Sequence, residues 1–118
     1  MSPTVLIVDD HAVFRASVRL LLESGGFTVA GEAATGEEAL ALALELRPAL
    51  VLLDVQLPDL DGFEVAERLT GLDQPPQVIL TSTRDRADYG SLIASAPARG
   101  FVGKGELTAE ALRGLLDD

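Results

Sequence analysis

Four apolar runs in this chain each end on a small polar or charged residue, and this repeated pattern constrains the fold most. The runs are residues 5–8, 50–53, 78–81 and 101–103. The polar residues that end them are, in chain order, Asp9 with Asp10, Asp54, Ser82 and Lys104. If the runs are parallel strands of one sheet, their carboxyl ends share one edge, where ligands bind in such sheets. Three carboxylates, a hydroxyl and an ammonium group then meet there, which is a site for a divalent cation and a phosphoryl group.

The apolar runs alternate with helical patterns, which is typical of βαβ units and a parallel sheet. The predicted strands are residues 4–9, 27–33, 50–54, a fourth that ends near Ser82, and 100–103. A first predicted helix follows the first strand, with apolar residues at 13 and 20–22 in helical spacing, and stops at the glycines 25–26. The other predicted helices span 36–47, 63–70, 84–96 and 108–116. The helix over 84–96 is expected to be poor, because Gly90 and Ser91 lie inside it and Pro97 closes it. Five strands in strict alternation with five helices predict an α/β fold with an open, doubly wound sheet.

Length and composition favour one domain over residues 1–118, with 47% hydrophobic residues to fill a core. No run reaches the roughly 18 apolar residues that a membrane-spanning helix needs. The N-terminus has neither the basic region nor the apolar segment of a signal peptide. The chain has no cysteine, so disulfides and thiolate metal sites are excluded. We therefore expect a cytoplasmic protein with no membrane partner.

The net charge of −10 argues against direct nucleic-acid binding by this domain, because phosphates would be repelled. The only lysine is Lys104, at the end of an apolar run, while all other basic residues are arginines. One interpretation is a compositional preference for arginine. The other is that this position needs a compact ammonium group on a flexible stem, which arginine does not supply.

Asp9, Asp10 and Asp54 would repel one another strongly unless a cation lies among them. Oxygen ligands from a few protein groups suit Mg²⁺. The alternative is that each aspartate only caps a helix or a turn, which is a common role for a residue in the position of Asp10. Asp54 follows four apolar residues and precedes Val55, which is not a capping context.

The carboxylate of Asp54 has the chemistry of a nucleophile that attacks phosphorus and forms an acyl phosphate. The cation and Lys104 would then stabilise the negative charge of the phosphoryl oxygens. The hydroxyl of Ser82 could donate a hydrogen bond to one of these oxygens, or only bond to the backbone, and Thr81 and Thr83 leave its register open. His11 has no histidine partner for a metal site and is expected in a loop at the edge of the site.

Four segments together resemble the receiver domain of bacterial two-component response regulators. They are residues 5–11 (Val-Leu-Ile-Val-Asp-Asp-His), 52–62 (Leu-Leu-Asp-Val-Gln-Leu-Pro-Asp-Leu-Asp-Gly), 80–82 (Leu-Thr-Ser) and 100–104 (Gly-Phe-Val-Gly-Lys). The resemblance covers essentially the whole chain. Asp-Asp-His and residues 29–33 (Val-Ala-Gly-Glu-Ala) look most like the subfamily with a C-terminal helix-turn-helix (LuxR-type) output domain.

The resemblance implies a flavodoxin-like (βα)5 fold with strand order 2-1-3-4-5, a partner histidine kinase, Mg²⁺ and an output domain or homodimer. Asp54 would be the phosphoacceptor and Lys104 would bind the phosphoryl group. Asp9, Asp10, Asp54 and the backbone carbonyl of Gln56 would hold Mg²⁺. Ser82 and Phe101 would form the switch, which shifts a population between two states, although Phe101 could also be an ordinary core aromatic.

The chain departs from the family pattern near its last strand. Gly105 follows the lysine where proline or an acidic or polar residue is usual. Residues 96–98 read Ala-Pro-Ala in place of Ala-Gly-Ala, so the fourth helix must end differently, because proline fixes φ near about −65°. We therefore expect the surface of the fourth helix, fifth strand and fifth helix to be loosely ordered, and the family's activated dimer to be disfavoured.

Two other classes of function remain open on the sequence. One is a phosphohydrolase that works through an aspartyl phosphate, but those enzymes carry Asp-x-Asp-x-Thr at the first strand, whereas here the acids are adjacent. The other is a receiver-like module that is never phosphorylated. A nucleotide or flavin module lacks support, because no Gly-rich phosphate loop follows a strand. The main interpretation is a signalling domain that phosphorylates itself and converts no outside substrate.

Overall fold

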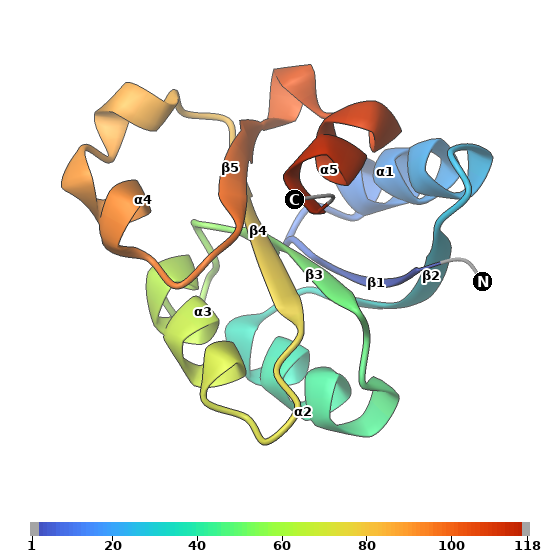
Figure 1. Cartoon of the computed structure of the whole chain (residues 1–118), viewed down its shortest axis with the longest axis horizontal. Coiled ribbons are helices and arrows are strands. Elements are labelled where there is room, and N and C mark those ends of the chain that lie inside the picture. Colours follow the sequence, from blue (N-terminus) through green and yellow to red (C-terminus); the bar gives the residue numbers. More distant parts are fainter. Residues whose placement is uncertain (1–2, 117–118) are drawn as a thin grey trace.

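The computed structural model describes residues 3–116 and contains one parallel sheet of five strands in the order β2-β1-β3-β4-β5 (Figure 1). The strands are β1 (Thr4–Val8), β2 (Thr28–Ala33), β3 (Leu50–Asp54), β4 (Gln77–Ser82) and β5 (Gly100–Gly103). The predicted α/β class and strand order are therefore confirmed. Because β1 lies between β2 and β3, the order reverses beside β1, and the acids that follow β1 and end β3 come to neighbouring positions.

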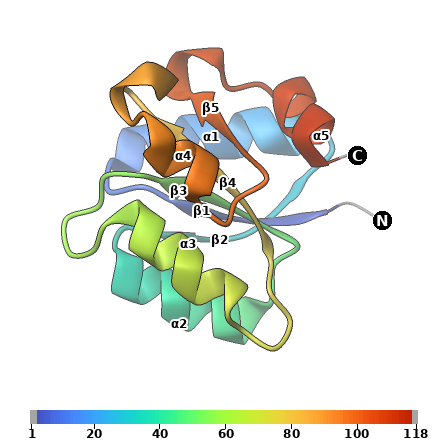
Figure 2. The same ribbon diagram turned by 60° about the vertical axis from the view of Figure 1, so that its left-hand side comes forward.

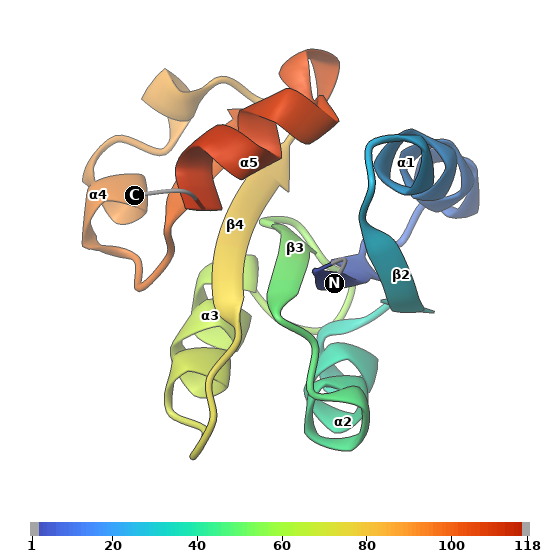
Figure 3. The ribbon, with the colours of Figure 1, turned by 45° about the vertical axis from the view of Figure 1, so that its right-hand side comes forward.

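Helices cover both faces of the sheet, with α1 and α5 on one side and α2 and α3 on the other (Figure 3). The α-helices are α1 (Ala12–Ser24), α2 (Gly36–Leu46), α3 (Gly62–Thr70), α4 (Ser91–Ser95) and α5 (Ala109–Leu116). Two 3-10 helices, η1 (Arg86–Asp88) and η2 (Lys104–Glu106), lie in the last third of the chain. In residues 3–116 we find no helix with the length and apolar character to cross a membrane.

The central strands β1, β3 and β4 are apolar on both sides because each face of the sheet packs against helices. Val5 and Ile7 of β1 join the core under α1 and α5, whereas Leu6 and Val8 join the core under α2 and α3. All five residues of β3 are buried, which explains why its sequence does not alternate between apolar and polar residues.

The loop between β3 and α3 is tied to the elements around it. Gly62 lies so close to β3 that a Cβ there would come within 2.5 Å of the Asp54 carbonyl oxygen. Within the loop, the carboxylate of Asp59 accepts hydrogen bonds from Gly36 N (2.8 Å) and Glu37 N (3.0 Å) at the start of α2. These backbone N–H groups, that of Glu37 most of all, hold the pKa of Asp59 below its usual range.

The segment between β4 and β5 is less regular than the rest of the chain. In place of one helix over 84–96, η1 is followed by Gly90, which has φ +54° and ψ −128°, and then by the five residues of α4. Figures 1 and 2 show α4 beyond β5, at the edge of the sheet. Helix α2 ends at Leu46, one residue before its expected end, because Arg47 adopts a left-handed conformation before Pro48.

We predict that Gly62→Ala lowers the free energy of unfolding by about 1–3 kcal/mol, because the added methyl group overlaps the β3 backbone. Gly114→Ala is the matched control: a Cβ at this exposed helical position meets nothing, and the variant should gain about 0.5 kcal/mol. Urea unfolding of both variants measures the difference, and equal stabilities would contradict the close approach at Gly62.

We also predict that the backbone amides of residues 86–96 exchange with solvent at least roughly tenfold faster than those of α3, because this segment has short helices and few buried side chains. Hydrogen exchange measured by NMR gives both sets of rates. Protection as strong as that of α3 across 86–96 would rule out a loosely ordered segment.

Candidate functional site

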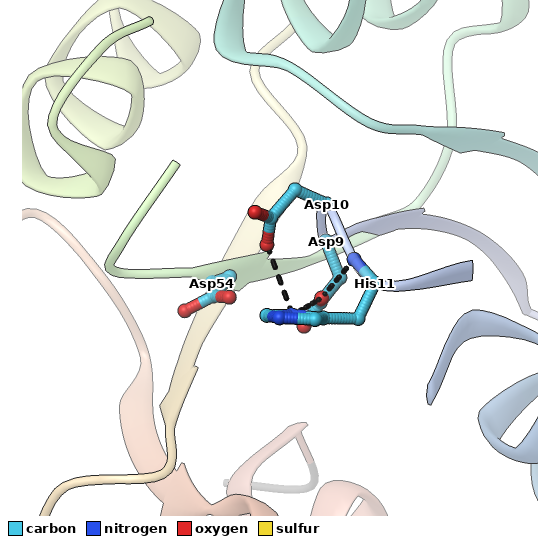
Figure 4. A group of neighbouring side chains, drawn as sticks. All are labelled: Asp9, Asp10, His11 and Asp54. Atoms are coloured by element: carbon cyan, nitrogen blue, oxygen red, sulfur yellow. Dashed lines mark hydrogen bonds and ion pairs between the residues drawn. The ribbon is translucent and has the colours of Figure 1, made fainter. Parts of the chain in front are cut away.

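The carboxyl ends of the strands bring the predicted acids together (Figure 4), and the lysine joins them. Oxygen atoms of Asp9, Asp10 and Asp54 and a ring nitrogen of His11 all lie within 4.8 Å of one another. Lys104 follows β5, and its Nζ lies 2.6 Å from Asp9 Oδ2 and 3.2 Å from Asp54 Oδ2. The side chains at the carboxyl ends of β1, β3 and β5 therefore share one site, as their positions in the sequence predict.

Asp9 and Asp10 are adjacent in sequence but have different surroundings. Asp9 is fully buried, and its Oδ1 accepts a hydrogen bond of 2.8 Å from the backbone N–H of His11. Asp10 is exposed, and its Oδ1 lies 3.0 Å from His11 Nδ1, which is also 3.2 Å from Asp9 Oδ1. Figure 4 shows the His11 ring beside both carboxylates. Asp9 is thus fixed by the protein, whereas Asp10 faces solvent.

Asp54 is buried at the end of β3, where two donors hold its carboxylate. Gln56 N–H donates to Oδ1 at 3.0 Å, and Lys104 Nζ donates to Oδ2 at 3.2 Å. Burial nevertheless raises the pKa of Asp54 to about 6, and the Asp9 carboxylate adds to this, although Gln56 N–H and Lys104 act in the opposite direction. Burial therefore outweighs the two donors and keeps the pKa of Asp54 above its usual value.

Lys104 is held between the two acids and an aromatic ring. Its Nζ lies 4.4 Å from the centre of the Phe14 ring, on α1. Burial alone would lower the pKa of Lys104, but Asp9 and Asp54 outweigh it and raise this pKa above its usual value. The ammonium group therefore remains charged at neutral pH.

A cavity of about 220 Å³ opens beside these groups. Its lining residues are Asp10, His11, Asp54, Gln56, Leu57, Pro58, Thr83 and Lys104. The site holds three carboxylates and one lysine, and the pKa of Asp54 is raised. A small divalent cation would stabilise the ionised carboxylates, and Mg²⁺ prefers such oxygen ligands. The donor set therefore fits Mg²⁺, with Gln56 at the rim of the cavity.

The hydroxyl expected from Ser82 lies to one side of the cavity. Ser82 Oγ is buried, shares a hydrogen bond of 2.6 Å with Tyr89 Oη, and accepts one of 3.1 Å from Arg84 N. Thr83 lines the cavity, whereas Thr81 pairs in register with Asp54 and its Oγ1 has no hydrogen-bond partner within residues 3–116. In this conformation the hydroxyl nearest to the cavity is that of Thr83.

Phe101 of β5 is half-buried and packs against the core under α2 and α3. Its ring centre lies 6.0 Å from that of Tyr89. The contacts of Tyr89 and Phe14 with this site were not predicted from the sequence, whereas His11 lies at the edge of the site as expected. Tyr89 is the only tyrosine of the chain, but the amino-acid composition does not show that it lies beside Ser82.

We predict that Asp54→Asn is more stable than the parent chain by about 1–2 kcal/mol at pH 7.5 without Mg²⁺, with solvent screening taken into account. The pKa of Asp54 rises on folding from its ordinary 3.8 to about 6, so the ionised carboxylate disfavours folding. This cost is fully present above pH about 6 and is lost below about 4, where the carboxyl group is protonated in both states.

Urea unfolding between pH 4.5 and 7.5 measures this difference, with the exposed Glu67→Gln as a control for the loss of one negative charge. A stability gain that does not depend on pH would contradict a raised pKa at Asp54.

Comparison with known protein families matches residues 5–116 to the response regulator receiver domain. A protein of Pseudomonas aeruginosa is 44% identical over 108 residues, which are 92% of this chain and 52% of the relative. The transcriptional regulatory protein AfsQ1 of Streptomyces coelicolor is 43% identical over 86 residues, 73% of this chain and 38% of AfsQ1. The chain thus spans about half, or less, of the length of the curated relatives it matches.

Solved structures agree with the sequence comparison. A two-component response regulator of the LuxR family from Aurantimonas sp. SI85-9A1 superposes with a TM-score of 0.87 at 27% identity, over 99% of this chain and 84% of that one. The response regulator domain of Thermotoga maritima CheB gives 0.85 at 26% identity, over 99% and 96%. With the five-stranded fold and the acids at its edge, these matches lead to one conclusion: the chain belongs to the receiver domain family of two-component response regulators.

Proposed function

We propose that residues 1–118 form a single receiver domain that accepts a phosphoryl group on Asp54 from a histidine kinase. The observation that supports this most is the state of the Asp54 carboxylate. It lies at a cavity with Gln56 N–H on one oxygen and Lys104 on the other. A carboxylate held in this way and ionised above pH about 6 can act as a nucleophile toward a phosphoryl group bound in the cavity.

In the proposed reaction, an Asp54 oxygen attacks phosphorus as the P–N bond of a phosphohistidine breaks, and the freed imidazole takes up a proton. Asp9, Asp10, Asp54 and the Gln56 carbonyl would hold Mg²⁺, which supplies positive charge for the phosphoryl oxygens. Lys104 keeps its charge and would move from Asp54 Oδ2 to a phosphoryl oxygen. The domain acts only on itself and converts no outside substrate.

Ser82 and Phe101 would carry the signal away from Asp54 as a shift between two conformations. Phosphorylation would draw the Ser82 hydroxyl toward the phosphoryl group, and the Phe101 ring would turn inward behind it. The short α4 and the glycine at position 90 make the nearby surface adaptable. We infer that this surface contacts an output domain or a second copy of the chain.

The relatives point to transcription as the output, since AfsQ1 is a transcriptional regulatory protein. With a net charge of −10, this domain itself would repel DNA, so DNA binding would belong to an attached domain. A phosphohydrolase remains a second candidate, but no separate observation favours it.

We predict that acetyl phosphate with Mg²⁺ adds about 80 Da to the chain in intact-mass spectrometry (the mass of HPO₃), and that Asp54→Asn abolishes this labelling because it removes the nucleophile. Asp73→Asn, at an exposed position away from the cavity, is the matched control and should label like the parent.

Omission of Mg²⁺, or Asp10→Asn, should slow labelling at least roughly tenfold, because less positive charge then faces the phosphoryl oxygens. Labelling of Asp54→Asn at the parent rate would show that another residue is the acceptor. Sustained release of phosphate from a phosphomonoester would favour the phosphohydrolase.

A further inference from the structure

Tyr89 holds the hydroxyl that the proposed switch needs. Its Oη lies 2.6 Å from Ser82 Oγ, which also accepts a hydrogen bond from Arg84 N. Ser82 is 1% exposed, so water does not compete for its hydroxyl. A buried serine hydroxyl has one proton and two lone pairs, and these two contacts occupy most of this capacity. Either hydroxyl of this pair can be the donor, and where Ser82 donates, its only proton is committed to Tyr89 Oη and is not available to a phosphoryl group on Asp54.

The ring of Tyr89 links Ser82 to two other aromatic side chains. Its centre lies 5.8 Å from that of Phe63 on α3, at an interplanar angle of 70°, and 6.0 Å from that of Phe101 on β5, at 58°. Edge-to-face and tilted pairs at these distances are favourable for aromatic rings. Any movement of Tyr89 therefore also changes the packing around Phe101.

The backbone on each side of Tyr89 allows such a movement. Tyr89 follows η1, where Asp85 and Asp88 cap each other's backbone, and precedes Gly90, whose φ of +54° suits glycine. Tyr89 also borders a cavity of about 490 Å³, which Phe63 and Leu92 help to line. The ring therefore borders open space, and the glycine after it separates η1 from α4.

We propose that Tyr89 is a positioning residue that holds Ser82 away from the phosphoryl site, so that phosphorylation of Asp54 must break the Tyr89–Ser82 hydrogen bond. This inference rests on the proposed phosphorylation of Asp54. Release of Tyr89 frees its ring from the contacts with Phe63 and Phe101 and changes the surface around α4. The hydrogen bond favours the unphosphorylated conformation and sets a threshold for activation.

The test uses beryllium fluoride with Mg²⁺, because this anion occupies the place of a phosphoryl group on a carboxylate. Tyr89→Phe keeps the ring and removes only the hydroxyl. It should bind beryllium fluoride roughly two- to tenfold more tightly than the parent, since Ser82 no longer has to leave a hydrogen bond. Thr70→Val removes a hydroxyl that bonds only to the α3 backbone and should leave the Kd unchanged.

Ser82→Ala provides the decisive comparison. In the Ser82→Ala background, Tyr89→Phe should no longer change the Kd, because the hydrogen bond is already absent. A purely structural role of the tyrosine hydroxyl would give the same change in both backgrounds. The proposal would be overturned if Tyr89→Phe bound beryllium fluoride with an unchanged or higher Kd. It would also be overturned if Tyr89→Phe changed the Kd equally with Ser82 and with Ser82→Ala.

The chain itself supplies a second readout, because Tyr89 is its only tyrosine and it has no tryptophan. Beryllium fluoride with Mg²⁺ should change the tyrosine fluorescence of the parent, and an unchanged spectrum at saturation would contradict release of Tyr89. If the parent bound no beryllium fluoride, the proposed phosphorylation and this inference would both be wrong. If it bound with the Kd of Tyr89→Phe, only the role of Tyr89 would be wrong.

Discussion

The burial of neighbouring carboxylates at the ends of β1 and β3 is the constraint on which this site depends. Lys104 reaches both Asp9 and Asp54, yet the burial of Asp54, with the Asp9 carboxylate adding to it, keeps the pKa of Asp54 near 6. Because Asp9 is buried and fixed by His11 N–H, the repulsion between these carboxylates cannot be relieved by rotation of that side chain into solvent. The site is therefore assembled in a strained electrostatic state, which a cation or a phosphoryl group would change.

Much of this arrangement could be predicted from the sequence because it follows from strand order. Asp9, Asp54 and Lys104 directly follow or end apolar runs, and in a parallel sheet the ends of such runs meet. The burial of β3 on both faces could also be predicted, since an apolar run without alternation must pack against other elements on each side. The fold and the meeting of these three side chains thus need only local pattern and topology.

The contacts outside the strands could not be predicted in the same way. Which hydroxyl faces the cavity depends on how the chain turns after β4, and the turn brings Thr83 to the cavity while Ser82 meets Tyr89. The position of Tyr89 depends in turn on the break at Gly90, which divides the expected helix over 84–96 into η1 and α4. Such long-range contacts of loop side chains leave no periodic signal in the sequence.

The hydrogen bonds from α2 to Asp59 fix the β3–α3 loop on one side of the site, and within residues 3–116 the segment after β4 on the other side has no comparable helix anchoring it. The loop after Asp54 is anchored to a long helix and pressed against β3 at Gly62, whereas the segment after β4 ends in short turns. A conformational change that starts at Asp54 would therefore meet more contacts in the β3–α3 loop than in the segment after β4. If Asp54 is phosphorylated as proposed, we expect any displacement to occur on the side of β4 and β5.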